Sequence, residues 1–571
     1  MSTSVKTIFF SEIFIVLFMI LGLVPQEFSY LVLILLGVSF ARLSVMDSLR
    51  LFIISIPFFT AFPANQFSDS MSVWRILIGV LFLKVVYEKT GQFHSPERLW
   101  IRCAGWRNKQ RIALGFHRAI ATMEPAEERA KSGFRLWITD MLKIKKTKAN
   151  NYRNLLNLFI LFLAINVISL FFAQYTGAGI KKISFIVDIV LLFPVTFYAI
   201  RKEGDAVSLL KYAFYASFEV VIIGYLQFFL TFFISLSKFW EFWTGSVIKV
   251  FYGQNLSYLL SYSNTWFSYY ETLPPTLRMF SVFPDSHSFP MFVLISIPIV
   301  LSLIFYYRGR RKNFYIACLI IYLLSIYFSG SRGVWVSSAF AFLSCFALFA
   351  FPKINKDIFS KIKNSSKKEI NSRMIIASVA LFFILFPISS FLLTRNQEVQ
   401  LARSGIGLDE DKENAMFRRI LSISDLSEMS NKGRIQIWIE TISYIGKHPL
   451  LGIGPGNFPL VLDQDLSSSK KGSSAHNIYL DIAVETGIFG VIFFVLIVLE
   501  ILNRSRKLFY RLKPGYAKIF AGAFFVYFFW ISFYGLFDVV ILNDKVLIFL
   551  VIVIGILYSL EGLECETESQ G

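Results

Sequence analysis

The sequence predicts an all-α, polytopic integral membrane protein with about 12–14 transmembrane helices. Three observations lead to this fold class. The chain has 571 residues, of which 55% are hydrophobic, and its mean hydropathy is +0.59. Apolar runs of about 18–25 residues recur along almost the whole sequence, and each is long enough to cross a bilayer. Lys and Arg gather in short segments between these runs. Because backbone groups in lipid must be satisfied within the segment, we expect the runs to be helices.

Each apolar run defines one expected helix, bounded by charged or turn-forming residues. The expected helices, in chain order, lie near 7–24, 29–45, 49–63, 72–88, 154–174, 182–200, 206–236, 288–307, 313–330, 333–351, 374–394, 478–502, 517–535 and 541–560.

The basic segments between these helices predict the orientation of the chain. Short loops rich in Lys and Arg stay in the cytoplasm. Such loops follow the helices that end near residues 200, 307, 351 and 502. With fourteen spans, all four fall on the cytoplasmic side. Two long loops, 237–287 and 395–477, then face the outside, and the second is a long extracytoplasmic loop before a late helix.

The net charge of +19 raises the question of a nucleic-acid partner. We expect none, because the basic residues follow the positive-inside pattern rather than forming a binding surface. Segment 89–153 carries 15 Lys/Arg against 5 Asp/Glu. It is either a basic cytoplasmic insertion of amphipathic helices on the membrane lipid or an ordinary cytoplasmic loop. The four cysteines have no metal-ligand spacing, and we expect neither a metal nor a cofactor.

The most informative polar residue of the chain is His476, in the segment Ala475-His476-Asn477 just before an apolar run. If a helix begins near Asn477, the positive end of its dipole favours the neutral imidazole, which is the form that a general base needs. The alternative is that His476 is a polar residue at the membrane interface. Glu485 lies about two helical turns deeper, where a carboxylate needs a partner. It would orient a polar group or brace an arginine.

Arginines at expected outer positions are candidates for binding an anion. Arg332 stands between glycines at a junction of two helices with almost no loop, so it is either an anion clamp or a snorkelling residue in a turn. Arg434 begins an amphipathic helical pattern, where free N–H groups also bind anions. The alternative for Arg434 is a solvated surface residue. Arg278 and His287 end the other outer loop, and His287 is a second candidate for the base, in less constrained surroundings.

A glycine-rich turn, Gly452-Ile453-Gly454-Pro455-Gly456-Asn457, precedes His476 by about twenty residues. Gly452, Gly454 and Gly456 predict an unusual backbone. The turn lacks the Gly-Lys-Ser/Thr of a nucleotide-binding loop. It either contacts a ligand directly or places the next segment.

Arginines and one histidine on the outer face suit a particular chemistry. The planar guanidinium makes bidentate hydrogen bonds to phosphate oxygens. A histidine nearby suits deprotonation of a hydroxyl nucleophile. A membrane-embedded diphosphate and a hydroxyl acceptor together describe glycan transfer from a polyprenyl carrier.

Residues 318–500 resemble the O-antigen ligase/polymerase superfamily of polyprenyl-diphosphate-dependent membrane glycosyltransferases. The resemblance rests on the order and spacing of four motifs, namely Ser331-Arg332-Gly333, Gly433-Arg434 with Trp438, His448 to Phe458, and His476 to Leu480 with Glu485 to Gly490. The segment from Arg278 to Pro290 looks like a weaker upstream element of such proteins.

The resemblance implies a fold of the membrane glycosyltransferase C type in the bacterial cytoplasmic (inner) membrane. It implies transfer of a glycan from undecaprenyl diphosphate to an acceptor hydroxyl, on lipid A-core or another glycan, at the periplasmic or outer face. Carried onto this chain, His476 is the general base, and Arg332 and Arg434 hold the diphosphate. No metal or nucleotide is expected to take part.

The expected organisation of the chain follows from these segments. It comprises N-terminal helices (1–88), the basic insertion (89–153), central helices with an outer loop (154–317), the ligase-like domain (318–500), and C-terminal helices with an acidic tail (501–571).

Other functions fit the same sequence. An O-antigen or exopolysaccharide polymerase differs from a ligase only in its acceptor. A solute transporter is an alternative from another class, although we see no internal symmetry of the kind that transporters show. A non-catalytic scaffold for polysaccharide export is a third.

Overall fold

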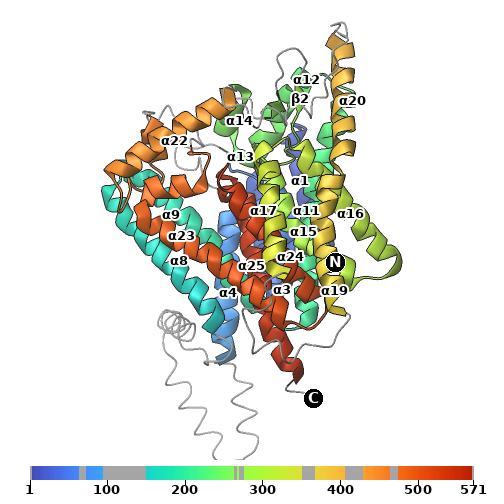
Figure 1. Cartoon of the computed structure of the whole chain (residues 1–571), viewed down its shortest axis with the longest axis vertical. Helices are drawn as coiled ribbons and strands as arrows, with labels where there is room; N and C mark the ends of the chain where they lie inside the picture. Colours follow the sequence, from blue (N-terminus) through green and yellow to red (C-terminus); the bar gives the residue numbers. More distant parts are fainter. Residues whose placement is uncertain are drawn as a thin grey trace, which may run out of the picture.

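The protein is built almost wholly of α-helices. The computed structural model describes residues 3–63, 72–93, 150–262, 266–268, 275–349, 367–404, 429–462 and 474–568. Within these ranges the only paired strands are two residues long each, β1 (Phe267–Ser268) and β2 (Thr276–Leu277), which run antiparallel. Helices stand side by side in a bundle, and α20, α22 and the α12–α14 region gather at its upper end in Figure 1. We call this end the site end.

The N-terminal half of the described chain contains α1 (Thr3–Ile20), α2 (Phe28–Arg42), α3 (Val45–Ser55), η1 (Ile56–Phe58), α4 (Val73–Phe93), α8 (Asn150–Ser169), η2 (Leu170–Phe172), α9 (Thr176–Val190), α10 (Leu192–Ala199), α11 (Glu203–Leu230), α12 (Leu236–Phe242), η3 (Trp243–Ile248), α13 (Lys249–Tyr252) and α14 (Gln254–Tyr262).

The C-terminal half contains α15 (Ser288–Tyr306), α16 (Gly309–Phe328), α17 (Arg332–Phe349), α19 (Lys367–Ile384), α20 (Phe386–Ser404), α22 (Met429–Lys447), η5 (Phe458–Leu462), α23 (Ile478–Arg511), α24 (Tyr516–Tyr534), η6 (Val540–Leu542) and α25 (Asp544–Glu568).

The described helices confirm the predicted fold class. Eight of them are long and apolar enough to cross a membrane, so the chain is a multi-pass membrane protein. Large apolar side chains on the outside of the bundle, such as Phe10 and Phe14 of α1, are exposed in the absence of lipid. Several other predicted spans are present as shorter helices, for example α2 and α3.

Helix α15 forms the centre of the bundle. Nearly all of its side chains are buried, although Pro298 lies inside it. It packs against α24, α16 and α11. Because α15 is apolar on every side, it is stable only when other helices surround it. Its first residue, Ser288, lies at the site end, directly after His287.

Some helix boundaries differ from the predicted ones. The run predicted as one helix at 182–200 is two helices, α9 and α10, and α9 already begins at Thr176. The run at 374–394 is also divided, at Leu385, and α20 extends to Ser404 into the predicted loop 395–477. Hydropathy does not detect these boundaries, because the break in each case lies between equally apolar residues.

The predicted outer loop 237–287 is largely helical in its described part. It contains α12, α13 and α14, with a π-helical stretch at Trp243–Ile248, and then the short β1–β2 pair. Trp266 stacks on Phe280 with ring centroids 4.3 Å apart. Aromatic residues of this segment thus pack into the apolar core of the bundle.

Other predictions concern residues outside the described ranges. Most of insertion 89–153 belongs to this part of the chain, apart from its ends in α4 and α8. The basic segment near 353–363 and all of 405–428 also lie outside the described residues. The predicted division into five regions remains a prediction.

The expected amphipathic helix at Arg434 is α22, but it begins at Met429, so the prediction that Arg434 begins the helix beside its free N–H groups is wrong. Ile437 and Tyr444 on one side pack against a small cluster of buried side chains that includes Phe458 and Val484. On the opposite side, Ile439 is 64% exposed. Thus α22 lies across the site end of the bundle with one face inward (Figure 1).

Candidate functional site

His476 lies in a short connection whose backbone is unusual. Its φ is +47°, and it is one of only two non-glycine residues with positive φ in the described chain. Asn477 follows as the N-cap of α23, and its Oδ1 accepts hydrogen bonds from the backbone N–H groups of Tyr479 and Leu480 at 3.0 and 3.2 Å. The cap therefore fixes where α23 begins and holds His476 one residue before it.

Three contacts from different elements hold this connection in place. The indole Nε1–H of Trp438 in α22 donates to the carbonyl of Ala475 at 2.8 Å. The N–H of Ala475 donates to Asp481 Oδ1 at 3.2 Å. The N–H of Ile478 donates to the carbonyl of Gly535, after α24, at 2.8 Å. A left-handed conformation costs a non-glycine residue free energy, and such contacts offset that cost.

The imidazole of His476 is held in its neutral form. Its pKa is lowered to about 4, mainly by burial and then by the charge of Arg434, whereas Asp481 and Asp285 act in the opposite direction. Its Nδ1 atom is buried and has no hydrogen-bond partner among the described residues. A buried ring nitrogen without a partner is expensive, so the site favours a ligand that supplies the missing hydrogen bond.

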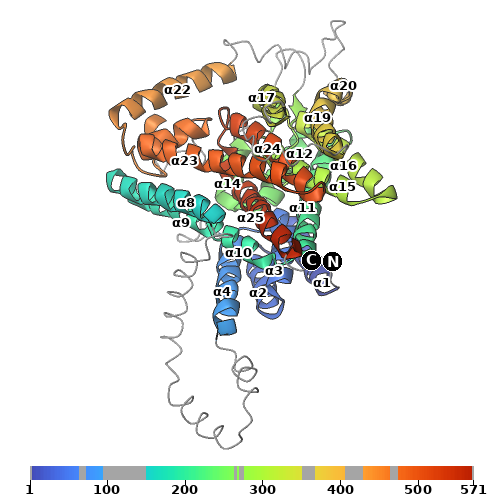
Figure 2. The ribbon, with the colours of Figure 1, turned by 60° about the horizontal axis from the view of Figure 1, so that its bottom comes forward.

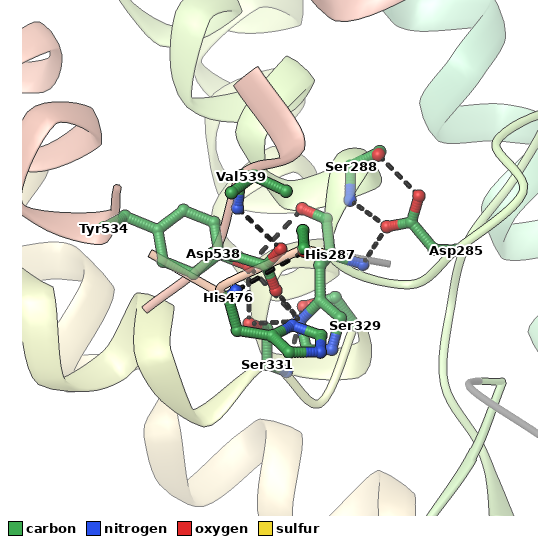
Figure 3. A network of polar contacts seen from close by, with 10 residues as sticks. Asp285, His287, Ser288, Ser329, Ser331, His476, Tyr534, Asp538 and Val539 are labelled. Carbon is green, nitrogen blue, oxygen red and sulfur yellow. Dashed lines mark hydrogen bonds and ion pairs between the residues drawn. The ribbon is translucent and has the colours of Figure 1, made fainter. Parts of the chain in front are cut away.

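A second histidine, His287, is held in a network of polar groups from three segments (Figure 3). Its Nδ1 lies 3.0 Å from Ser331 Oγ, 3.3 Å from the Tyr534 hydroxyl and 3.7 Å from Asp538 Oδ2. Ser331 Oγ and the Tyr534 hydroxyl are also 2.8 Å apart. The expectation that His287 has less constrained surroundings is therefore wrong, because the junctions before α15, before α17 and after α24 all meet at its ring.

Two carboxyl groups flank the histidines. Asp285 accepts hydrogen bonds from the backbone N–H groups of His287 and Ser288 at 2.9 and 2.6 Å, and so fixes the start of α15. Burial raises the pKa of Asp285 to about 6. Burial also raises the pKa of Asp538 to about 6, while Arg434 lowers it. Both groups are ionised at pH 7, and both favour positive charge between them.

The predicted arginines occupy different positions around the site. Arg434 lies in the first turns of α22, and its charge acts on both His476 and Asp538. Arg332 is the first residue of α17, half-buried, directly after Ser331. Arg278 directly follows β2, and its Nε donates to Ser268 Oγ of β1 at 3.1 Å. The structure thus brings Arg434 and the start of α17 to the histidines and places Arg278 in the β1–β2 region.

The glycine-rich turn forms backbone hydrogen bonds at a break in α23. Gly487 inside α23 has φ +67° and ψ −168°, which interrupts the helix. The carbonyls of Val484 and Glu485 are then free to accept from the N–H groups of Ile453 and Gly454, each at 2.9 Å. A Cβ on Gly452 would overlap the backbone of Glu485. The glycines of this turn therefore allow two backbones to approach closely, and the structure places the turn against α23.

The neighbouring turn glycines serve the same packing. A Cβ on Gly454 would overlap Ala173, and one on Gly456 would approach the carbonyl of Ala178 too closely. Asn457 Oδ1 accepts from the N–H of Tyr175 at 2.9 Å. The turn is thus fixed on one side to α23 and on the other to the connection between α8 and α9.

Glu485 has a lysine as its partner, not an arginine. Lys182 Nζ of α9 lies 2.5 Å from Glu485 Oε2 and 3.5 Å from Asp481 Oδ2. The other oxygen, Glu485 Oε1, accepts from the N–H of Gly456 at 3.0 Å. This ion cluster connects α9, α23 and the glycine-rich turn, and it supports the His476 connection through Asp481.

Sequence reasoning did not identify several residues of the site. These are Tyr534, Asp538, Asp481 and Lys182. A signal was available for Asp538, since it is a carboxylate between the apolar runs of α24 and α25. Nothing in the local pattern predicted that Lys182 would meet Asp481, because the two are about 300 residues apart and only the folded bundle joins them.

The fold and the site together define a polytopic α-helical membrane protein whose histidines, arginines and carboxylates gather at one end of the bundle. Residues 317–495 match the model of a protein family described as O-antigen ligase. The chain thus carries an O-antigen ligase domain, which confirms the resemblance to this superfamily. No curated protein sequence matches the chain. This domain supports a membrane enzyme that transfers glycans, of the kind that includes the ligases and polymerases of polysaccharide biosynthesis.

The matched segment does not contain the whole site. It includes Arg332, Arg434 and His476. His287 precedes it, and Tyr534 and Asp538 follow it. A general lipid-linked glycan donor and a glycan acceptor are the partners that the family implies.

Proposed function

We propose that this protein moves a glycan from undecaprenyl diphosphate to an acceptor hydroxyl on the extracytoplasmic face of the bacterial inner membrane, as an O-antigen ligase does. The family match supports glycan transfer in general. The donor, the direction and the residues that carry out the reaction are our assignments.

The observation that carries this assignment is the state of His476. Its imidazole is neutral at pH 7, its buried Nδ1 has no hydrogen-bond partner in the described chain, and contacts from α22, α23 and Gly535 fix its backbone. These are properties of a general base that waits for a substrate hydroxyl. A pKa of about 4 makes it a weak base in the resting site.

Binding of the donor would change this basicity. Arg434 lowers the pKa of His476 by repulsion, and a bound diphosphate would neutralise Arg434. A negative charge nearby also favours the imidazolium form. The pKa of His476 therefore rises when the anionic donor is in place, and the base becomes stronger in the complex that needs it.

The reaction is a single in-line displacement at the anomeric carbon. His476 accepts the proton of the acceptor hydroxyl while the acceptor oxygen forms its bond to that carbon. The bond from the carbon to the diphosphate oxygen breaks, and the carrier leaves with that electron pair. Arg434 and Arg332 stabilise the charge that grows on the diphosphate, and such electrostatic stabilisation usually contributes most to a reaction of this kind. Arg278, whose Nε donates to Ser268 Oγ, is a further candidate for holding the diphosphate.

The first test compares surface glycans of a deletion strain that carries either the wild-type protein or His476→Ala. We expect His476→Ala to abolish visible transfer, because loss of a general base lowers a rate by about 10²–10⁴-fold. The protein should still insert in the membrane. His448→Ala is the matched control, since His448 is an exposed histidine just after α22. Normal glycan attachment with His476→Ala would refute the role of the base.

The carrier-linked glycan extracted from these strains separates ligase from polymerase. Long chains that accumulate on the carrier and are missing from their acceptor indicate a ligase for lipid A-core or another acceptor. Single repeats that persist without long chains indicate an O-antigen or exopolysaccharide polymerase. Loss of solute uptake with unchanged glycans would indicate a transporter. A His287→Ala strain in the same series tests whether His287 is the base instead.

A further inference from the structure

A cavity of about 460 Å³ lies between α8, α9, α23 and α25. Its walls are almost entirely apolar. Representative wall residues are Phe159 and Phe162 of α8, Ile186 of α9, Ile497 of α23, and Val551 and Ile554 of α25. We call it the α8–α25 cavity. Its volume is in the range of about 300–1,000 Å³ that is typical of ligand-binding sites.

Polar residues also line the cavity, namely Asn166, Lys181, Lys182, Ser474, Asp481, Glu485 and Thr486. Ser474 is an uncharged residue two positions before His476, and its Oγ accepts a hydrogen bond from the N–H of His476 at 3.4 Å. Val539, which follows Asp538, also lines the cavity. The cavity is thus continuous with the segment that carries the base and with the segment that carries Asp538.

The chemistry of the walls selects the occupant. A glycan needs hydrogen-bonding partners, and apolar walls offer none, so burying sugar hydroxyls there would be costly. A hydrocarbon chain is stabilised by burial against Phe, Ile and Val. Because α8 and α23 are two of the membrane-spanning helices, the walls run at the depth of lipid chains. A phospholipid could also fill such a space, but only the lipid of the donor must place its head group beside His476.

We infer that the α8–α25 cavity holds the first isoprene units of the polyprenyl chain of the donor, with its diphosphate end toward Ser474 and His476. This inference rests on the proposed function and adds to it a binding site for the lipid. Lys181 and Lys182 line the cavity and are exposed and half-buried, respectively, so their positive charge favours a diphosphate beside them. The protein would then hold both the lipid chain and the diphosphate of the donor, and so fix the position of the bond that breaks.

Binding of undecaprenyl diphosphate to the purified full-length protein tests this inference. Ile186→Trp and Val498→Trp would each fill the cavity from a half-buried wall position. Val187→Trp and Leu499→Trp are matched controls, because each is the next residue on the same helix and is exposed on the outside. Farnesyl diphosphate serves as a second probe with the same head group and a short chain. Phospholipid that copurifies with each variant is measured in parallel.

The expected result is that both filling variants weaken undecaprenyl diphosphate binding by at least about tenfold, as loss of several buried methylene contacts predicts. Both controls should bind like the wild type. The advantage of undecaprenyl over farnesyl diphosphate should also shrink in the filling variants.

Other outcomes separate this inference from the proposed function. If the wild type binds undecaprenyl diphosphate and the filling variants bind it equally well, the cavity does not hold the chain, although the proposed donor stands. If the filling variants lose only copurified phospholipid, the cavity is a phospholipid site and the inference is overturned. If the wild type does not bind undecaprenyl diphosphate, the proposed donor fails together with the cavity assignment.

Discussion

At the scale of single residues, the site depends on how the charges around His476 are balanced. Burial and Arg434 both favour the neutral ring, whereas Asp285 and Asp481 favour the charged one. Arg434 also acts on Asp538. One guanidinium thus influences a candidate base and a neighbouring acid. In the proposed reaction it also binds the leaving group, so binding of the donor and activation of the base are coupled.

Arg434→Gln should raise the pKa of His476 from about 4 toward its ordinary value, because one cause of the lowered pKa is removed while burial remains. In a titration without the donor, His476 would then take up its proton at higher pH. The measurement is an NMR titration of ring-labelled histidine, with His476→Gln to assign the signal among the five histidines. Lys432→Gln, a change at an exposed position two residues earlier in α22, is the control. An unchanged pKa in Arg434→Gln would show that burial alone sets it.

The sign of the linked stability change follows from the same shift. In the unfolded chain His476 takes up a proton near its ordinary pKa of about 6.5, whereas in the folded protein it does so only near 4. Between these two values the unfolded state binds more protons, so this residue lowers the stability of the fold as the pH falls from about 6.5 to 4.

At the scale of elements, the break in α23 is the feature that the site requires. Gly487 interrupts the helix, and the segment from Pro449 to Gly454 supplies the hydrogen bonds that the interruption would otherwise leave unmade. Ser169 Oγ of α8 lies 2.5 and 2.7 Å from the carbonyl oxygens of Leu451 and Glu485, which share its single O–H donor. The glycine-rich turn, the helix break and the start of α23 therefore form one unit.

Gly487→Ala should destabilise this unit. A Cβ there would overlap the carbonyl of Leu450, and φ +67° is strained for alanine. The strain alone costs about 1–3 kcal/mol, so we expect a lower thermal midpoint in detergent and reduced transfer. Gly446→Ala in α22 is the control, because it meets open space and has a helical backbone. Equal midpoints for the two variants would contradict the assigned role of the break.

At the scale of the whole molecule, the ligase domain depends on helices outside it. Lys182 of α9 binds Asp481 and Glu485 of α23, and His287 and Asp538 reach the site from α15 and from the turn after α24. The site is completed only where these distant segments meet in the bundle.

Lys182→Met should destabilise the junction of α9 and α23, because it leaves two buried carboxylates without their cation. Breaking a buried pair costs up to about 3–5 kcal/mol, and the partial exposure of Lys182 places this case at the lower end. Its thermal midpoint should fall relative to Lys181→Met, the change at the adjacent exposed lysine. Adding Glu485→Gln should restore part of the loss, since the amide oxygen still accepts from Gly456. No recovery in that double variant would argue against an electrostatic cause.

The sequence predicted most membrane helices to within a few residues, because twenty consecutive apolar residues have few other stable states in lipid. It also placed His476 and Asn477 at a helix start, where cap chemistry is local, but it began the helix of Arg434 five residues too late. It did not predict the break at Gly487 or the partner of Glu485. These features depend on which backbone and which charge arrive from elsewhere in the chain. The role of Asp538 was missed for the same reason.

The division of α23 has a consequence for how the enzyme tolerates different membranes. Bilayers vary in thickness, and long helices adapt to hydrophobic mismatch by tilting. The two turns that follow His476 are bound to α22, Gly535 and the glycine-rich turn, and the break at Gly487 interrupts the helical hydrogen bonds between them and the rest of α23. A change of tilt in the later part of α23 is therefore not carried rigidly to the base, so the break lessens the effect of bilayer thickness on the geometry of the site.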